Sequence, residues 1–490
     1  MNRHVFILTL IVLLSCSAKI GWTKPILCTK LRAQLDSKND ATIGVLLQFL
    51  PPRGRLTASV SREATQSAIK SLKIKFRQLK ELWICHGCFI EAKTSELRKL
   101  LNEDTLLAMA IPSVRQRPAP LLPDEKTLRS DNEYTYGLSM LNVPKIWQDF
   151  GLKGQGVTVG ILDSGWTNHP ELQGRVLKSR DFIDGAADDT PADEYDHGTH
   201  CMGTIGGGSA SGKAIGIAPE VKFLVGKIFS KWKDATDDLI LEAMQWMADP
   251  DGNPLTNDQP RVVSNSWGDA PQDAALEGLY QSAINTWTEL GMVSVFAAGN
   301  DGKPGTVNSP GGHEGALAVG SVTSKEKLSF FSSKGPFKFD GREYAKPDLC
   351  APGSAVYSLT PDGGYGNKSG TSMATPHVAG VVALMLQANP EITVKRAQEI
   401  LLTSCLDLGD EGYDLSYGHG RIDAYKALQK TLAEGNLKLE FVFSGSVSTP
   451  WTELGSWKAV SGKKGGKVLT VTILAGTHAT EIRAYCYTSE

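Results

Sequence analysis

Four polar residues, far apart in the chain, have the types needed for nucleophilic catalysis. The first is Ser372, which lies in a run of small residues, 370–380, just ahead of the apolar run 381–386. This pattern is expected of a nucleophile at the start of a buried helix, where free N–H groups and a partial positive charge face developing negative charge. A serine that only caps a helix gives the same pattern, so Ser372 needs partners elsewhere.

Two other segments supply those partners. Residues 157–162 are rich in β-branched side chains and predict a buried strand that leads into Asp163, while His197 opens a second run of small residues. A serine hydroxyl needs a base to take its proton, and a histidine base needs an anion to hold its tautomer. Asp163, His197 and Ser372 are therefore a candidate catalytic triad, in that chain order.

The fourth residue is Asn300, which follows an apolar strand within the Gly-containing turn 297–302. Its side-chain NH₂ can donate to an oxyanion, together with the backbone N–H of Ser372. The four residues predict acyl transfer through a covalent intermediate on Ser372, with no cofactor required for the chemistry.

The segments around these four residues resemble the subtilisin-like serine proteases, the subtilases. The resemblance covers residues 133–430 and extends to segments 264–268, 345–353 and 418–424. It implies a serine endopeptidase that acts on polypeptides. The substrate-binding residues that it implies are Ser266, Trp267, Gly268, Ala298 and Gly299. Their apolar character predicts uncharged, medium or large side chains at P1, the residue before the cleaved bond.

Strands and helices alternate through this region, which predicts an α/β fold with a doubly wound, mostly parallel sheet. The predicted strands are 157–162, 221–228, 262–265, 292–297 and 316–322, and the predicted helices are 239–247, 274–289 and 379–387. Active sites in such sheets lie at the carboxyl ends of the strands, where Asp163 and Asn300 fall.

Residues 1–18 predict an export signal. Its apolar run, 5–14, follows a short basic region and is too short to span a bilayer. Cleavage near Ala18 is one interpretation, and a lipid-modified Cys16 is the other. We therefore expect a secreted or extracytoplasmic protein, lipid-anchored before maturation in the second case. The net charge of −2 gives no indication of nucleic-acid binding.

Residues 30–117 predict a ferredoxin-like β-α-β-β-α-β unit. The elements are strand 43–50, helix 61–79, strands 82–85 and 89–92, helix 94–101 and strand 106–112. The unit resembles the inhibitory propeptide of subtilases, so the chain's own propeptide is an expected partner. A polar, Pro-containing linker, 118–132, suits proteolytic release. Residues 436–490 alternate in polarity and predict a small antiparallel β region.

An acidic loop ahead of His197 is a candidate calcium site. Asp181, Asp184 and Asp189 supply carboxylate oxygens, which hard cations prefer. A similar loop binds calcium in thermitase-like subtilases. A solvated acidic loop without an ion is the alternative.

Two cysteine features bear on chemistry. Cys85 and Cys88 form a Cys-His-Gly-Cys segment, for which a local disulfide or a free pair is favoured over a metal site because no second pair accompanies it. Cys201 follows His197 by one helical turn and should lie near the base, which predicts inhibition by mercurials.

The favoured function is that of an exported serine endopeptidase, made as a zymogen with a self-cleaved propeptide. The alternative is a catalytically inactive exported binding or scaffold protein on the same fold. A third interpretation keeps the chemistry but restricts it to maturation of one exported partner.

Overall fold

The computed structural model describes residues 24–54, 56–115, 133–184, 192–339 and 341–434, and the strands 459–461, 467–475 and 478–486. The predicted signal segment, the linker 118–132 and Asp189 lie outside the described residues. Within the described part of the chain, no helix has the length and apolar character needed to cross a membrane.

A seven-stranded, all-parallel sheet forms the centre of the larger unit, in the order β16-β13-β12-β11-β7-β9-β8. The strands are β7 (Thr158–Asp163), β8 (Val176–Asp181), β9 (Lys222–Lys227), β11 (Val262–Asn265), β12 (Val293–Ala297), β13 (Leu317–Val322) and β16 (Leu349–Pro352). All five predicted strands are present, and both ends of each strand lie within one residue of their expected positions. The prediction of a doubly wound parallel sheet is confirmed, and β8 and β16 extend it.

Helices cover both faces of this sheet because successive side chains of each strand point to opposite sides. Val159 and Ile161 belong to the apolar cluster on one face, whereas Leu162 belongs to the cluster on the other. The first cluster includes residues of α6 (Gly198–Gly206), α9 (Thr371–Ala388), α10 (Val394–Ser404) and α11 (Ala424–Glu434), together with α4 (Tyr136–Met140) and α5 (Val143–Phe150). The second cluster includes α7 (Asp237–Ala248) and α8 (Ala274–Glu289).

The order of the strands fixes where a site can form. From β7 the chain adds β8 and β9 on one side, then crosses to β11 and continues outward on the other side. Strands β7 and β11 are therefore neighbours at the topological switch point, where ligands bind beyond the carboxyl ends of the strands. Asp163 ends β7, and Ser266 follows β11 directly.

The N-terminal unit contains a mixed sheet in the order β1-β5-β2-β4-β3. Its elements are β1 (Ile26–Leu27), α1 (Thr29–Asp36), β2 (Thr42–Phe49), α2 (Ala58–Ser71), β3 (Gln78–Leu82), η1 (Trp83–Cys85), β4 (Gly87–Lys93), α3 (Thr94–Leu97), η2 (Arg98–Asn102) and β5 (Leu106–Ala110). Strands β5, β2, β4 and β3 have the ferredoxin-like order, and β1 adds a parallel edge strand to β5.

Two predictions for this unit are wrong in detail. The helix expected over 61–79 ends at Ser71, and β3 occupies the end of that range. Apolar residues at 72, 74 and 76 alternate with basic ones, and this period of two places them on the apolar cluster without a helix. The strand expected at 82–85 is instead the 3₁₀ turn η1, whose three side chains are all buried.

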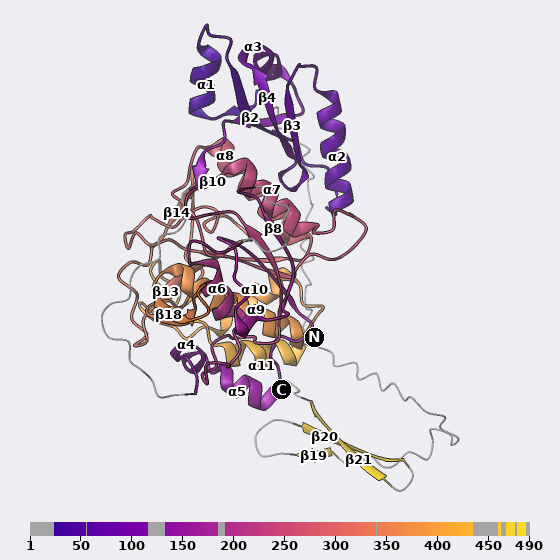
Figure 1. Cartoon of the computed structure of the whole chain (residues 1–490), viewed down its shortest axis with the longest axis vertical. Helices are drawn as coiled ribbons and strands as arrows, with labels where there is room; N and C mark the ends of the chain where they lie inside the picture. The colour runs from indigo at the N-terminus through magenta and orange to yellow at the C-terminus, as the bar shows by residue number, and fades with distance from the viewer. Residues whose placement is uncertain are drawn as a thin grey trace, which may run out of the picture.

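The N-terminal unit lies over α7 and α8 (Figure 1). Turn η1 packs against both helices, and one continuous apolar cluster includes residues of the N-terminal sheet and of these helices. Strand β6 (Val114–Arg115) pairs antiparallel with β10 (Ala235–Thr236), just ahead of α7. The unit is therefore joined to the larger one by packing and by a shared β ladder.

The remaining elements are small. They are η3 (Pro170–Leu172) and the pairs β14 (Phe337–Phe339) with β15 (Arg342–Tyr344) and β17 (Val356–Leu359) with β18 (Tyr365–Lys368). Strands β19 (Ala459–Ser461), β20 (Lys467–Ala475) and β21 (His478–Cys486) form an antiparallel sheet, as predicted for the C-terminal region. The first part of that predicted region, 436–458, lies outside the described residues.

Candidate active site

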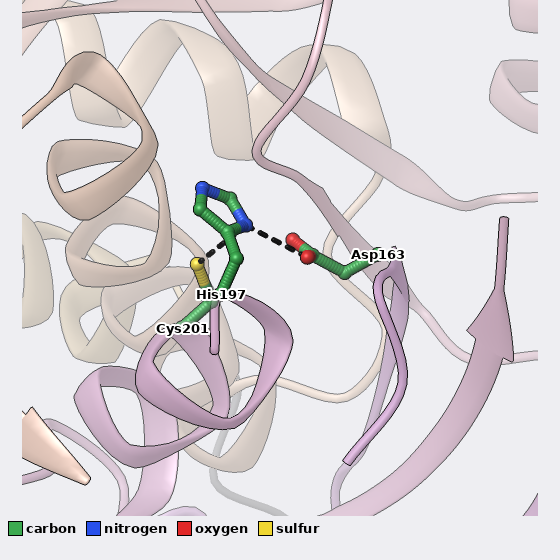
Figure 2. Close-up of side chains that lie close together, drawn as sticks. All are labelled: Asp163, His197 and Cys201. Atoms are coloured by element: carbon green, nitrogen blue, oxygen red, sulfur yellow. Dashed lines mark hydrogen bonds and ion pairs between the residues drawn. The ribbon is translucent and has the colours of Figure 1, made fainter. Parts of the chain in front are cut away.

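Asp163 and His197 meet at the end of β7. His197 Nδ1 donates to Asp163 Oδ1 at 2.7 Å, and both side chains are buried (Figure 2). Gly198 makes this approach possible, because a Cβ at that position would lie 2.2 Å from the carbonyl oxygen of Gly165. The start of α6 is thus held against the loop that follows β7.

The charge of Asp163 controls the protonation of His197. Burial alone lowers the pKa of His197, but the negative charge of Asp163 and its hydrogen bond raise that pKa well above its usual value. The carboxylate also fixes the tautomer, because it can only accept and therefore holds the proton on Nδ1. The opposite nitrogen, Nε2, is left to act as a base.

Asp193 organises the same loop and was not predicted from the sequence. Its Oδ1 accepts from the Ser164 hydroxyl at 2.7 Å and from the Asp196 N–H at 2.9 Å, and its Oδ2 accepts from the Thr199 N–H at 2.8 Å. Burial raises the pKa of Asp193, partly offset by these hydrogen bonds. An acidic residue shortly before a small-residue helix is the signal that could have indicated this capping role.

Ser372 is the second residue of α9 and is buried. Its hydroxyl donates to the carbonyl oxygen of Ser266 at 3.0 Å, and the Ser266 hydroxyl donates back to the carbonyl oxygen of Ser372 at 2.9 Å. Among the described residues, no hydrogen bond joins Ser372 to His197, whose buried Nε2 has no partner. In enzymes without substrate, such catalytic contacts are often long and tighten only in the complex.

Cys201 lies between these groups. Its Sγ is 3.9 Å from His197 Nδ1 (Figure 2). Its thiol also donates to the carbonyl oxygen of Ser372 at 3.5 Å. The placement one helical turn after His197 is as predicted. Burial raises the pKa of this thiol, which disfavours the thiolate and hence a role as nucleophile. One ligand atom each from Asp163, His197 and Cys201 lies within 4.8 Å of the other two.

Asn300 is oriented by the start of α9. Its Oδ1 accepts from both the N–H and the hydroxyl of Thr371, each at 2.9 Å. Both partners are donors here, so the amide oxygen faces Thr371 and the NH₂ group points away from it. A Cβ added to Gly370 would lie 3.5 Å from that NH₂ nitrogen, so the amide lies beside the residue two before the nucleophile.

Among the expected substrate-binding residues, Ser266 exchanges two hydrogen bonds with Ser372, and the Gly299 N–H donates to the hydroxyl of Thr371 at 3.2 Å. The Trp267 ring is buried between Phe229 and Phe296 and makes edge-to-face contacts with both. A Cβ at Gly299, whose φ is +109°, would lie 2.8 Å from side-chain atoms of Asn308 and Ser333.

The remaining two expected positions are equally confined. Ala298 is fully buried, and a Cβ at Gly268 would lie 2.9 Å from the carbonyl oxygen of Ser309. The role of these residues in substrate specificity stays a prediction.

The acidic loop ahead of His197 is only partly described. Asp181 Oδ1 accepts from the N–H groups of Ile183 and Asp184 at 2.8 and 3.1 Å, and Lys227 Nζ lies 3.6 Å from Asp181 Oδ2. Since Asp189 lies outside the described residues, calcium binding in this loop stays a prediction. An acidic cluster does occur elsewhere, in the loop that follows α7.

The other cysteines and histidines have local roles. Cys85 and Cys88 are buried and free, so of the two favoured alternatives the structure has the unbonded pair. His377 Nδ1 donates to the carbonyl oxygen of Met373 at 2.8 Å. His200 Nε2 lies 3.0 Å from the carbonyl oxygen of Val356. Both histidines are buried, as expected of structural residues.

A buried acid–histidine pair at the switch point of a parallel sheet, beside a serine at a helix start, is the arrangement of a serine hydrolase. Residues 154–420 match the Subtilase family, Peptidase S8. This match covers more than half of the chain, which therefore belongs to this family of subtilisin-like serine endopeptidases.

Individual relatives agree with that assignment. Subtilisin DY from Bacillus licheniformis is 32% identical over 298 residues, which cover 60% of this chain and 98% of the relative. Thermitase from Thermoactinomyces vulgaris is 33% identical over 298 residues, covering 60% and 95%. Bacillopeptidase F from Bacillus subtilis strain 168 is 29% identical over 428 residues, covering 79% of this chain but only 29% of that relative.

Proposed function

We propose that this chain is an exported serine endopeptidase that cleaves polypeptides through an acyl-enzyme on Ser372 and is made as a zymogen. The observation that supports it most strongly is the buried 2.7 Å contact between His197 and Asp163. This contact lies at the carboxyl ends of the parallel strands, on the same side of the sheet as Ser372 and Asn300. Each of the four residues has a distinct role in the proposed reaction.

The Ser372 hydroxyl oxygen attacks the carbonyl carbon of the scissile bond while His197 Nε2 takes its proton. Asp163 stabilises the resulting imidazolium through its hydrogen bond with His197 Nδ1. The oxyanion accepts hydrogen bonds from the Asn300 NH₂ and the Ser372 N–H. Collapse of the tetrahedral intermediate breaks the C–N bond as His197 returns the proton to the leaving amine. Water, activated by the same base, then hydrolyses the ester to Ser372.

The N-terminal unit is proposed to be the inhibitory propeptide. Its last described strand, β6, pairs with β10, so the chain enters the larger unit as an added antiparallel strand. The interface also contains two buried ion pairs of Arg115, from Nε to Asp237 Oδ1 at 2.8 Å and from Nη2 to Glu277 Oε1 at 3.0 Å. Such desolvated contacts suit tight, specific docking of a segment that is later removed.

Three further features remain proposals. The proposal of export rests on the apolar segment at the N-terminus. Within it, cleavage near Ala18 is favoured over lipid attachment at Cys16. A P1 preference for uncharged side chains rests on the apolar residues around Ser372, and cleavage of a peptide library mainly after Arg or Lys would contradict it. Calcium binding by Asp181, Asp184 and Asp189 rests on the acidic loop, and an unchanged melting temperature in chelator would contradict it.

Labelling with a fluorophosphonate tests the proposed chemistry. We expect the mature wild-type protein to be labelled on Ser372 and to digest denatured casein, while Ser372→Ala does neither. A wild-type protein that is folded, free of its propeptide and still unlabelled would favour the inactive scaffold. Cleavage of a single protein in an extracellular mixture, rather than of many, would favour a dedicated maturation protease.

A further inference from the structure

The loop that follows α7 brings three carboxylates together. Asp249, Asp251 and Asp258 each place one carboxylate oxygen within 4.8 Å of the other two. The loop also holds its own shape, since Asp258 Oδ2 accepts from the Asp251 N–H at 2.9 Å and Thr256 donates to Asp251 at 3.0 Å. Asp251 and Asp258 are exposed, so solvent has access to the cluster.

Asp249 is the buried member of this cluster. The residue is only 6% exposed, and its Oδ1 has no hydrogen-bond partner among the described residues. An ionised carboxylate oxygen in this position is costly unless a cation balances it. The site also follows the C-terminus of α7 directly, where the helix dipole adds negative potential.

The propeptide places a cation on this cluster. Arg62 of α2 forms an ion pair with Asp249 Oδ2, and its Nη1 donates to the carbonyl oxygen of Gly252 at 3.1 Å. Lys178 of the larger unit is a second cation near the cluster: its Nζ donates to the carbonyl oxygen of Pro250, and its charge interacts with Asp251 and Asp258. Release of the propeptide would therefore leave three carboxylates without the guanidinium that faces them.

We propose that Asp249, Asp251 and Asp258 form a calcium-binding site in which the metal ion and the propeptide's Arg62 compete. Calcium fits because it is a hard cation that accepts carboxylate and carbonyl oxygens in flexible geometry, and this loop offers both. The cation and the guanidinium repel each other, so each weakens the binding of the other.

The proposal gives the loop a part in maturation. Any ligand that binds the released form better than the docked form shifts the equilibrium toward release. Calcium outside the cell would thus help to expel the propeptide and then stabilise the end of α7. This link to release rests on the proposed zymogen function, whereas the binding site itself does not.

Calorimetric titration of calcium into the full chain tests the site. The parent is Ser372→Ala, which keeps the propeptide attached if the proposed self-processing is correct and in any case cannot digest itself through Ser372. We expect Asp251→Asn combined with Asp258→Asn to lose one bound calcium, while Asp410→Asn, at an exposed position outside the cluster, keeps it. Equal calcium binding by the parent and the double variant would overturn the proposal.

Arg62→Ala tests the competition. Removing this one positive charge should tighten calcium binding on the order of tenfold. Lys80→Ala is the matched control. Lys80 also joins the propeptide to α7, through ion pairs with Asp238 at 3.0 Å and Glu242 at 2.9 Å, and neither carboxylate belongs to the cluster. An Arg62→Ala chain that binds calcium no more tightly than Lys80→Ala would overturn the competition.

A proton shared between two carboxylates is the other way to reduce the negative charge of the cluster. Burial and the charges of Asp258 and Asp251 raise the pKa of Asp249, so a proton between neighbouring carboxylates is chemically reasonable. In that case neither the parent nor Arg62→Ala would bind calcium in this loop at pH 8, and the proposal would fail. The titration does not depend on catalysis, so its failure leaves the protease proposal untouched.

Discussion

The side-chain oxygen of Asn300 accepts both hydrogen bonds that Thr371 can donate to it, each at 2.9 Å. Because an N–H and a hydroxyl hold that oxygen, the NH₂ of Asn300 is turned the other way without help from a substrate. A donor that is already oriented costs no reorganisation when negative charge develops, which is the main requirement of an oxyanion hole.

Asn300→Ala should therefore lower kcat by about 10²–10³-fold with little change in KM, a size taken from the same kind of change in subtilisin. Thr371→Val removes one of the two hydrogen bonds that orient the amide and should give a smaller loss. Steady-state kinetics on a peptide anilide measure both. A kcat for Asn300→Ala within a factor of three of wild type would contradict the assigned role.

The pH profile tests the Asp163–His197 pair. His197 must be unprotonated to act as a base, and Asp163 raises its pKa above the usual value, so activity should be lost as pH falls from above 6.5. Asp163→Asn removes the charge and leaves burial, which lowers the pKa. The acidic limb of kcat/KM should then move to lower pH while kcat falls by about 10⁴-fold. A limb that does not move would contradict the pairing.

Mercurials should inhibit the mature enzyme through Cys201. The sulfur lies beside His197 and Ser372, so a metal on it would block both groups. Cys201→Ala should keep most of the activity and lose the inhibition, whereas Cys405→Ala, at a half-buried cysteine elsewhere, should stay sensitive. The measurement is the residual activity of wild type and of both variants after saturating treatment with p-chloromercuribenzoate. Full activity of treated wild type would contradict the prediction.

Arg115 should make a large contribution to docking of the N-terminal unit on the larger one. Its guanidinium is buried with Asp237 and Glu277, and removing one member leaves uncompensated buried charge, at a cost of about 3–5 kcal/mol. In the Ser372→Ala background, Arg115→Ala should lower the free energy of unfolding by about that amount in urea. Lys99→Ala, at an exposed ion pair with Glu96, should cost no more than about 1 kcal/mol. Equal effects of the two substitutions would count against this prediction.

The same network sets a pH limit for docking. Burial alone raises the pKa of Glu277, but the hydrogen bond with His313 and the charge of Arg115 lower it to about 2. A carboxylate with a lowered pKa stabilises the folded state above its ordinary pKa, near 4.5, and this contribution is lost as pH falls towards about 2. Docking through Glu277 should thus persist in mildly acidic solution.

The residues proposed for catalysis could be predicted because each stands at the end of a strongly patterned element. The capping role of Asp193 had a sequence signal, but its partners could not be predicted, because they depend on how the loop folds back on Ser164 and α6. Strand β8 was missed because most of its side chains are not buried, and β16 because it is short and ends in a proline.

Contacts between the two units were also beyond the sequence. Arg115 lies 122 residues from Asp237 and 162 from Glu277, and no local period links positions so far apart. The same holds for Arg62 and Asp249, which are separated by 187 residues. Local patterns specify elements, but only the packing of the N-terminal unit on α7 and α8 brings these charges together.

Intact-mass spectrometry of the exported wild-type and Ser372→Ala proteins, prepared side by side, tests the central claim most directly. If Ser372 is the nucleophile of a self-processing protease, wild type should lose the propeptide, by cleavage beyond Arg115, while Ser372→Ala keeps it. If both chains keep the propeptide, or both lose it at the same bond, self-cleavage through Ser372 is contradicted.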